Sequence, residues 1–361
     1  MSCISELDTP SLMVDLNRLD LNIRGMQQVA EAARVRLRPH VKTHKSLAIA
    51  KKQLEAGATG ITCAKISEAE MMSAVSDDVF IAFPIVGEAK LSRLDKLSEK
   101  VRTRISVESE EGARSLSEHI QRSGRVQEVM VKAETGLRRT GVAIEEFGAF
   151  LQALSRMRNL HVAGFFTHEG QAYGCETRSE IEDVHAEVTE ILSRFGEVFV
   201  QTFDREPEIS PGCTLTARLA TRRDGITEMR PGMYVFADTK CVSSGMYAEE
   251  ECALTVLVRI VSVKPDGRVV VDGGSKTFAM DRHPLRGHGI VTGHPDLFFD
   301  RLSEEHGVML TECPVKYRVG DLLEVIPAHV CPVVNLHSVL NVRDGDNIVD
   351  KWTIDARGCV T

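Results

Sequence analysis

The stretch GITCAKISEAEMMSAVSDDVFIAFP, residues 60–84, decides the fold. It opens and closes with short apolar, β-branched runs that are typical of buried strands, and a helix-like segment lies between them. Ser67 and Glu70 have the spacing of a capping box at the start of that helix. The stretch is therefore predicted to be a strand–helix–strand unit.

The same alternation extends on both sides of this unit, from about residue 12 to 240. Eight strands are predicted, at residues 36–43, 60–65, 78–84, 102–109, 127–135, 162–170, 207–213 and 228–238. Eight evenly sized units favour an α/β fold of the TIM-like (β/α)8 barrel type. A doubly wound open sheet is the alternative, but the chain contains no GxGxxG motif.

The pattern changes after about residue 245. Residues 253–274 predict a β-hairpin that turns at Pro265-Asp266-Gly267, and further strand-like runs follow. We therefore expect a barrel domain over residues 12–240 and a mostly β domain over residues 245–361.

Composition and charge limit the class of partner. The chain has 44 basic and 52 acidic side chains and a formal charge of −8, which argues against nucleic acid or an anionic membrane as the main partner. No apolar run approaches the ~20 residues that span a bilayer. The N-terminal MSCISELDTP lacks the features of a secretory signal, and nine unpaired-looking cysteines fit a reducing compartment. We expect a cytoplasmic protein.

Reactive side chains gather where a barrel would place its chemistry, at the carboxyl ends of the strands. Lys42 follows the first predicted strand. An apolar barrel interior disfavours the ammonium form, so this lysine is a candidate amine nucleophile for a Schiff base. The alternative is an ion-paired structural lysine at the barrel rim.

Two later loops contain further candidates. The segment Ser210–Thr214 is small and contains a glycine, so its backbone N–H groups suit a phosphate, although an ordinary turn has the same composition. Arg139 could hold an anion or belong to a surface basic cluster with Arg138. His168 and Tyr173 could contact an aromatic ring or transfer a proton, and a hydrogen-bonded structural histidine is the alternative.

His329 and Cys331 form the candidate metal site. On a strand, positions i and i+2 face the same side, so an imidazole and a thiolate at this spacing can bind one metal ion. Two protein ligands leave coordination positions open, which suits a Lewis acid in catalysis. A buried histidine beside a small buried cysteine is the alternative.

Together these residues resemble the fold-type III pyridoxal phosphate (PLP) enzymes, the alanine racemase-like barrel group. The resemblance is closest to the branch of D-threonine aldolase and eukaryotic-type D-serine dehydratase. It extends from residue 38 to 336, in the stretches RPHVKTHKS, GITCAK, GLRRTGV, THEGQAY, SPGCT, RPGMYVFAD, VDGGSKTF, SEEHG and PAHVCPVVNL.

The resemblance implies a role for each candidate. Lys42, rather than Lys45, matches the Schiff-base lysine, and His40, His44 and Lys45 would shape its pocket. His329 and Cys331 match ligands of a divalent metal. The remaining matches contact PLP or its phosphate: Arg139, His168, Tyr173, Ser210, Gly212, Cys213, Thr214 and Tyr234. The family's architecture also implies a homodimer, with the N-terminal residues 1–11, and Ile4–Leu16 more broadly, associated with the β domain.

The reaction is expected to be a lyase reaction on a D-β-hydroxy amino acid. PLP stabilises a carbanion at the α-carbon, and a metal can assist at the β-oxygen. In this branch HxC resembles the dehydratases of D-serine and D-threo-3-hydroxyaspartate, whereas D-threonine aldolases more typically carry HxD. Cys331 thus favours dehydration to a 2-oxo acid and ammonia, and it favours zinc over manganese or magnesium.

Four alternatives remain. They are retro-aldol cleavage to glycine and an aldehyde, an amino acid racemase, a non-catalytic PLP-binding protein, and a PLP-free barrel that uses histidines for metal-dependent hydrolysis. Residues 245–361 argue against the PLP carrier, because that type generally lacks a C-terminal β domain.

Overall fold

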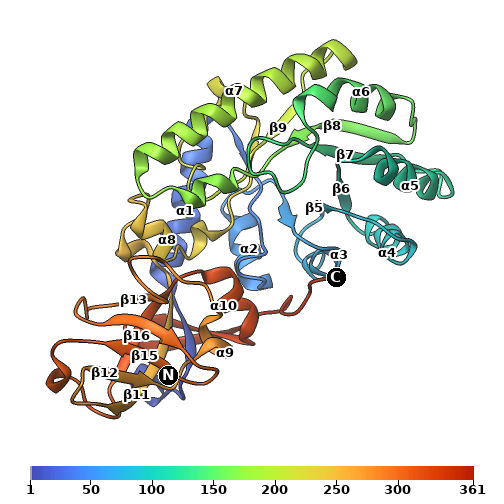
Figure 1. Ribbon diagram of the computed structural model, residues 1–361. Coiled ribbons are helices and arrows are strands. Elements are labelled where there is room, and N and C mark those ends of the chain that lie inside the picture. The colour runs from blue at the N-terminus through green and yellow to red at the C-terminus, as the bar shows by residue number, and fades with distance from the viewer. Residues whose placement is uncertain (1) are drawn as a thin grey trace. The chain divides into compact units, whose positions relative to one another are not determined.

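Figure 1 shows the computed structural model of the chain, which describes residues 2–361. The chain divides into two compact units. The barrel unit comprises Gly25–Lys42, Ile49–Gly232 and Cys359–Thr361, and the β unit comprises the N-terminal residues to Arg24, Thr43–Ala48 and Met233–Gly358. Each unit is described by itself.

The barrel unit contains eight parallel strands, one for each predicted segment. They are β3 (Arg36–Leu37), β4 (Ile61–Cys63), β5 (Asp78–Pro84), β6 (Arg102–Val107), β7 (Gln127–Lys132), β8 (Leu160–Phe166), β9 (Glu208–Ser210) and β10 (Glu228–Met229). Strands β4 to β9 form a six-stranded sheet in sequence order, and β3 pairs with β10.

Backbone hydrogen bonds connect these two sheets at both edges. Val41 donates to Thr62, 2.9 Å, and links the chain after β3 to β4. Thr227 donates to Ile209, 2.9 Å, and links β9 to β10. The ring of strands is therefore closed, which confirms the predicted α/β barrel class.

Helices cover the outside of the strands, as Figure 1 shows for α4 to α6. The helices up to α7 are α1 (Leu16–Ala33), α2 (Leu47–Glu55), α3 (Ile66–Met72), α4 (Glu88–Ser98), α5 (Glu110–Gln121), α6 (Ile144–Ser155) and α7 (Arg178–Phe203). The predicted capping box at α3 is wrong, because the helix begins one residue before Ser67. Glu70 instead forms an ion pair with Arg93, 2.6 Å.

Strand β8 shows how the two faces of the barrel wall are filled. Phe166 points inward and packs with Phe80, Met130 and Ala163. Its neighbour Phe165 points outward, 5.7 Å from the ring of Phe147 on α6. Because side chains alternate across a strand, one apolar run supplies both the barrel interior and the layer under the helices.

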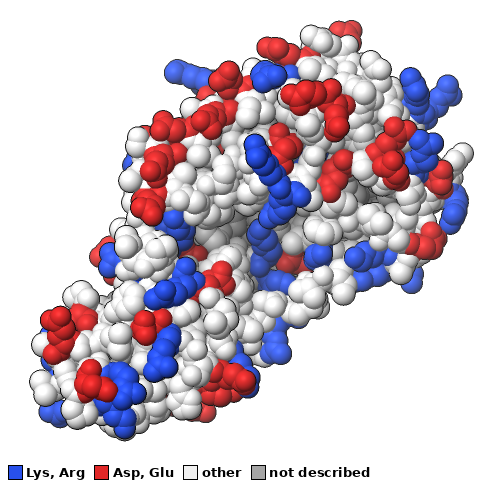
Figure 2. Space-filling view, viewed as in Figure 1, with Lys and Arg blue, Asp and Glu red and all other residues white. Residues whose placement is uncertain are grey.

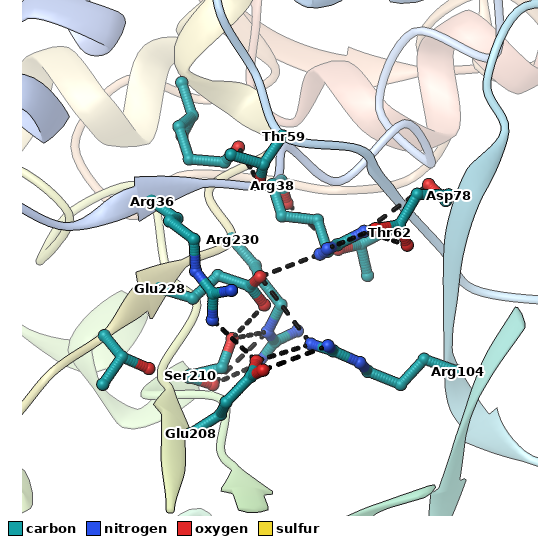
Figure 3. Close-up of polar contacts among 12 residues, drawn as sticks. Arg36, Arg38, Thr59, Thr62, Asp78, Arg104, Glu208, Ser210, Glu228 and Arg230 are labelled. Atoms are coloured by element: carbon teal, nitrogen blue, oxygen red, sulfur yellow. Dashed lines mark hydrogen bonds and ion pairs between the residues drawn. The ribbon is translucent and has the colours of Figure 1, made fainter. Parts of the chain in front are cut away.

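The amino ends of the strands are closed by buried charges (Figure 3). Arg38 lies between Glu228 and Asp78, with contacts of 2.8 Å to each, and is 2% exposed. Arg104, which is 1% exposed, reaches Glu128 and Glu208. Each buried guanidinium thus has at least two carboxylate partners. We call this set the base network: Arg36, Arg38, Asp78, Arg104, Glu128, Glu208 and Glu228.

The β unit is built on a mostly antiparallel sheet. Its strands are β1 (Ser2–Cys3), β2 (Ser11–Asp15), β11 (Leu254–Val263), β12 (Arg268–Val271), β13 (Gly289–Val291), β14 (Phe298–Leu302), β15 (Gly307–Leu310), β16 (Leu322–Pro327), β17 (Val339–Asp344) and β18 (Asn347–Thr353). Strand β2 pairs with β11 antiparallel and with β17 parallel, so the N-terminal segment is part of this sheet.

The predicted hairpin is confirmed as β11 and β12. Gly267 in its turn has φ +91, and a Cβ there would lie 2.3 Å from the carbonyl of Thr311, so the turn requires glycine. Three short helices complete the unit, α8 (Thr239–Ser243), α9 (Ser275–Phe278) and α10 (Val330–Leu336).

Surface charge is mixed. On the face shown in Figure 2, lysine and arginine are interspersed with aspartate and glutamate on both units. Within residues 2–361, no helix combines the length and the apolar character needed to cross a membrane.

Candidate active site

The carboxyl ends of the barrel strands bring together most of the predicted cofactor residues. Lys42 follows β3, His168 follows β8, and the loop Ser210–Thr214 begins at the end of β9. Arg139 lies in the loop after β7, and all of these belong to the barrel unit. Tyr234, His329 and Cys331 belong to the β unit.

Lys42 lies, partly buried, in the turn at residues 41–44 that follows β3. Its backbone N–H donates to Nδ1 of His40, 3.4 Å. Two neighbouring basic residues of the motif have hydrogen-bond partners elsewhere. His44 accepts from the backbone N–H of Ser46 at 3.1 Å, and Lys45 donates through Nζ to the carbonyl of Ala356 at 3.3 Å.

His168 is held as a neutral ring. Its Nδ1 contacts the carbonyl of Gly212, which can only accept a hydrogen bond, so Nδ1 carries the proton. Burial and the nearby charge of Lys42 lower the pKa of His168 to about 3. At neutral pH the ring therefore presents Nε2 as an acceptor, and it lies 6.1 Å from the ring of Tyr173.

Cys213 is a structural thiol. Burial raises its pKa to about 11, while Tyr173 and the backbone N–H groups of Leu215 and Thr216 hydrogen-bond to the sulfur. The thiol therefore remains protonated at neutral pH and fixes the turn in which Gly212 and Thr214 stand.

Ser210 has its side chain committed to the protein. Its hydroxyl donates to Glu228 at 2.8 Å and accepts from Nε of Arg230 at 2.9 Å, as Figure 3 shows. The Ser210 side chain therefore bonds to the barrel interior and not to a phosphate. The hydroxyl of Thr214, in the same predicted phosphate loop, is buried and has no hydrogen-bond partner within residues 2–361.

The structure adds Lys132 and Arg230, which the sequence reasoning missed. Burial and the charge of Arg139 lower the pKa of Lys132 to about 8, and its Nζ donates to the hydroxyl of Thr140 at 2.5 Å. Arg230 is fully enclosed, packs over the ring of Phe166, and has its pKa lowered to about 10 by burial. Lys132 is the last residue of β7 and Arg230 directly follows β10, but the sequence predicted longer strands there, 127–135 and 228–238, which placed both residues inside a strand.

Buried polar atoms without partners test whether this end of the barrel fits PLP. Among the described residues, four such atoms stand at or after strand ends: Oγ of Ser106, Oε2 of Glu108, Oε1 of Gln171 and Oγ1 of Thr214. Buried polar groups are normally satisfied, so unpaired ones indicate a polar group that is absent. A phosphate and a polar ring suit this set, because hydroxyls can donate to phosphate oxygens.

His329 and Cys331 do not lie on a strand, so that part of the prediction is wrong. Strand β16 ends at Pro327, His329 is the N-cap of α10, and Cys331 lies in its first turn. The two side chains still influence each other, since Cys331 is among the groups that raise the pKa of His329. Burial lowers the pKa of His329, but Cys331, Asp238 and Asp281 outweigh it and raise the pKa to about 9.

The surroundings of this pair are polar. The hydroxyl of Thr43 is 3.2 Å from Sγ of Cys331, and Oδ1 of Asp281 is 3.0 Å from Nδ1 of His329. Asp238, fully buried, accepts from the backbone N–H of Val330 at 3.3 Å. No cluster of three or more His, Cys, Asp or Glu residues arranged for a metal ion occurs in residues 2–361. His329 and Cys331 offer one nitrogen and one sulfur, donor atoms that zinc accepts.

Comparison with known proteins identifies a family. The family model of the alanine racemase N-terminal domain matches residues 14–240, and a model described as a serine dehydratase domain matches residues 253–343. D-threonine aldolase of Arthrobacter sp is 31% identical over 98% of this chain and 94% of that protein. D-threo-3-hydroxyaspartate dehydratase of Delftia sp. (strain HT23) is 29% identical over 96% of this chain and 97% of that protein.

Solved structures of the same two kinds of enzyme also match this chain. D-threonine aldolase from Filomicrobium marinum matches with a TM-score of 0.92 at 28% identity, over 99% of this chain and 97% of that chain. The dehydratase from Delftia sp. HT23 matches with a TM-score of 0.91 at 28% identity, over 98% and 99%. Solved variants of D-threo-3-hydroxyaspartate dehydratase, at 28% identity to this chain, include a cysteine-to-alanine variant in a metal-free form and an alanine variant of the histidine two positions earlier.

Proposed function

Since the chain belongs to the family of the alanine racemase N-terminal domain, we propose that it is a PLP-dependent lyase that acts on D-amino acids with a β-hydroxyl group. Two observations support this. Relatives that match almost the full chain include D-threonine aldolase and D-threo-3-hydroxyaspartate dehydratase. The carboxyl end of the barrel contains a lysine, a neutral histidine and unpaired buried polar atoms.

The barrel residues have distinct roles in this proposal. PLP, when bound, stabilises negative charge at the substrate α-carbon. Lys42 would hold the cofactor and take the α-proton at Nζ. The hydroxyl of Thr214 and the backbone of Gly212 and Cys213 would bind the phosphate, and His168 would contact the ring through its Nε2 face. Arg139, Tyr173 and Tyr234 would complete the polar contacts, with Ser210 acting through Arg230.

The contact between His329 and Cys331 carries the assignment to dehydration. A divalent metal, when bound, assists the departure of a β-hydroxyl group as a Lewis acid. A histidine and a cysteine two positions apart are also the residues replaced in solved variants of D-threo-3-hydroxyaspartate dehydratase, and the cysteine variant was solved in a metal-free form. Thiolate favours zinc, with manganese or magnesium as the other candidates. The products would be a 2-oxo acid and ammonia.

Retro-aldol cleavage is the second candidate. It is favoured by the 31% identity to D-threonine aldolase. In that reaction a base removes the proton of the β-hydroxyl, the Cα–Cβ bond breaks, and the products are glycine and an aldehyde. A racemase or a PLP carrier would not need the metal that the His329–Cys331 pair is proposed to bind. The presence of the β unit also argues against a PLP carrier, because that type generally lacks a C-terminal β domain.

Assembly and location are part of the same proposal. We expect a homodimer in the cytoplasm with a small-molecule D-amino acid as its partner. The support for a reducing compartment is that none of the nine cysteines forms a disulfide within residues 2–361.

Product analysis with D-threonine tests the reaction. The chain is loaded with PLP and zinc, and the products are identified by NMR. 2-Oxobutanoate and ammonia would establish the dehydratase, and glycine with acetaldehyde would establish the aldolase. If neither forms, D-serine and D-3-hydroxyaspartate follow as substrates, and no turnover of any of the three would refute the lyase.

A further inference from the structure

Asp281 is the carboxylate that faces the imidazole of His329. Its Oδ1 lies 3.0 Å from Nδ1 of His329. An ionised carboxylate only accepts hydrogen bonds, so Nδ1 is the protonated nitrogen of this contact. Because one ring nitrogen is engaged in this way, Nε2 is the nitrogen left for a metal ion.

The position of Asp281 is itself fixed by a buried residue. Nδ1 of His288, which is 5% exposed, donates to the backbone carbonyl of Asp281 at 2.8 Å. The carbonyl of His288 accepts from the backbone N–H of Ala328 at 3.0 Å, next to His329. The segment that holds Asp281 and the segment that holds His329 are therefore joined through one histidine.

Asp238, the second carboxylate near His329, has a different structural role. Asp238 caps α8, where Oδ1 accepts from the backbone N–H groups of Lys240 and Cys241, 3.1 and 3.2 Å. Its Oδ2 accepts from the backbone N–H of Val330 at the start of α10. Asp238 thus organises backbone, whereas Asp281 contacts the side chain of His329.

Stability alone gives little reason for the Asp281–His329 contact. Both side chains are partly exposed, 45% and 40%, and ion pairs at such positions contribute little to folding. A carboxylate on the distal nitrogen of a metal-binding histidine has a known physical effect. It fixes the ring orientation and tautomer and makes the ligating nitrogen a better donor.

We propose that Asp281 is a positioning residue for the metal, because it holds the imidazole of His329 with Nε2 presented for coordination beside Cys331. The inference rests on the metal site proposed above. It extends the site by one residue that touches neither metal nor substrate, and it includes His288 as the residue that holds Asp281 in place.

Metal affinity tests the inference independently of turnover. The full PLP-loaded chain is stripped of metal and titrated with Co²⁺, followed by competition with Zn²⁺ against a chromophoric chelator. Asp281→Ala is expected to bind both metals about 10–100-fold more weakly. At saturation its cobalt spectrum should keep the thiolate band, because His329 and Cys331 remain the ligands.

Asp300→Ala is the matched control. Asp300 pairs with Arg282, the residue after Asp281, at 3.7 Å. The control variant should bind metal like the original chain. Thermal unfolding of both variants without metal should be unchanged, which separates positioning from folding.

Three results would count against the inference. Asp281→Ala with unaltered affinity would overturn it and leave the proposed function standing. Loss of affinity together with an equal loss of metal-free stability would assign Asp281 a merely structural role. If the original chain binds neither metal, while it still binds PLP, both the metal-dependent function and this inference fail.

Discussion

The two ends of the barrel bury polar groups in opposite ways. At the amino ends of the strands, Arg38 and Arg104 are almost completely enclosed, and each contacts at least two carboxylates. At the carboxyl ends, Thr214 and Ser106 have buried oxygens without partners in the described residues. Both ends are charged and both are buried, so polarity alone does not distinguish them.

The difference lies in whether the polar groups are satisfied. The paired charges of the base network, at the amino ends of the strands, connect six strands: β3, β5, β6, β7, β9 and β10. They support the fold, as expected for that face of a barrel. Unsatisfied groups and neutralised bases, such as His168 with a pKa of about 3, are costly unless a ligand completes them. The comparison therefore assigns stability to one end and chemistry to the other.

Replacing Lys42 should produce the largest functional effect. We expect Lys42→Ala to lose covalently held cofactor and at least about 10³-fold in activity, because the Schiff base and the proposed proton transfer both need its amine. Stability without cofactor should be almost unchanged. Absorbance, borohydride reduction with peptide mapping, and chemical denaturation measure the three quantities.

Lys45→Ala is the control for this variant, because Lys45 stands in the same motif but donates to the carbonyl of Ala356. It should retain the cofactor band. A Lys42→Ala chain that still turns over would remove the central assignment of the carboxyl end.

Breaking the base network should lower stability and leave activity per folded molecule almost unchanged, the reverse of the effect of Lys42→Ala. Burial alone raises the pKa of Glu228, but Arg38 and Arg104 outweigh it and hold the pKa below its ordinary value. We expect Glu228→Gln to lower the free energy of unfolding by about 1.5–3 kcal/mol, because Arg38 then keeps Asp78 as its only carboxylate partner in the base network. Since the pKa is lowered in the folded state, the contribution is present above the unfolded pKa and is lost as pH falls through the folded one.

Urea denaturation across pH checks this prediction. Glu110→Gln removes an exposed pair with Arg114 and should change stability by less than about 1 kcal/mol. Equal effects of the two substitutions would show that burial at the base does not matter. Activity per folded molecule of Glu228→Gln should persist.

The sequence predicts the carboxyl end better than the base, and the reason is physical. Strand-like runs are local, so all eight strands could be read, and residues at their ends followed from the barrel topology. Arg38 and Glu228 pair across 190 positions, and no local pattern reveals that both point inward. His329-x-Cys331 was recognised from its residue types, but the helix start at Val330 is set by the buried Asp238, which sequence alone did not connect to it.

A pair of buried hydroxyls sharpens the comparison. Thr214→Val removes an unpaired hydroxyl and should leave cofactor-free stability equal or slightly higher, while PLP affinity falls by about tenfold or more. Ser210→Ala removes a hydroxyl bonded to Glu228 and Arg230 and should cost about 1–3 kcal/mol of stability. Fluorescence titration of PLP and denaturation measure both. If the two variants behaved alike, satisfaction of hydrogen bonds would not separate the two kinds of site.

The smallest effect concerns a ring that should not titrate. With its pKa lowered to about 3, His168 should keep the neutral Nδ1–H form from pH 5 to about 9 in ring ¹⁵N NMR. Its unfolded form binds a proton as pH falls below about 6.5. The folded form does not, so His168 lowers stability between that pH and about 3. Because the charge of Lys42 adds to burial in lowering this pKa, Lys42→Ala should raise it. An unchanged pKa in that variant would separate the two residues and weaken the case that they serve one site.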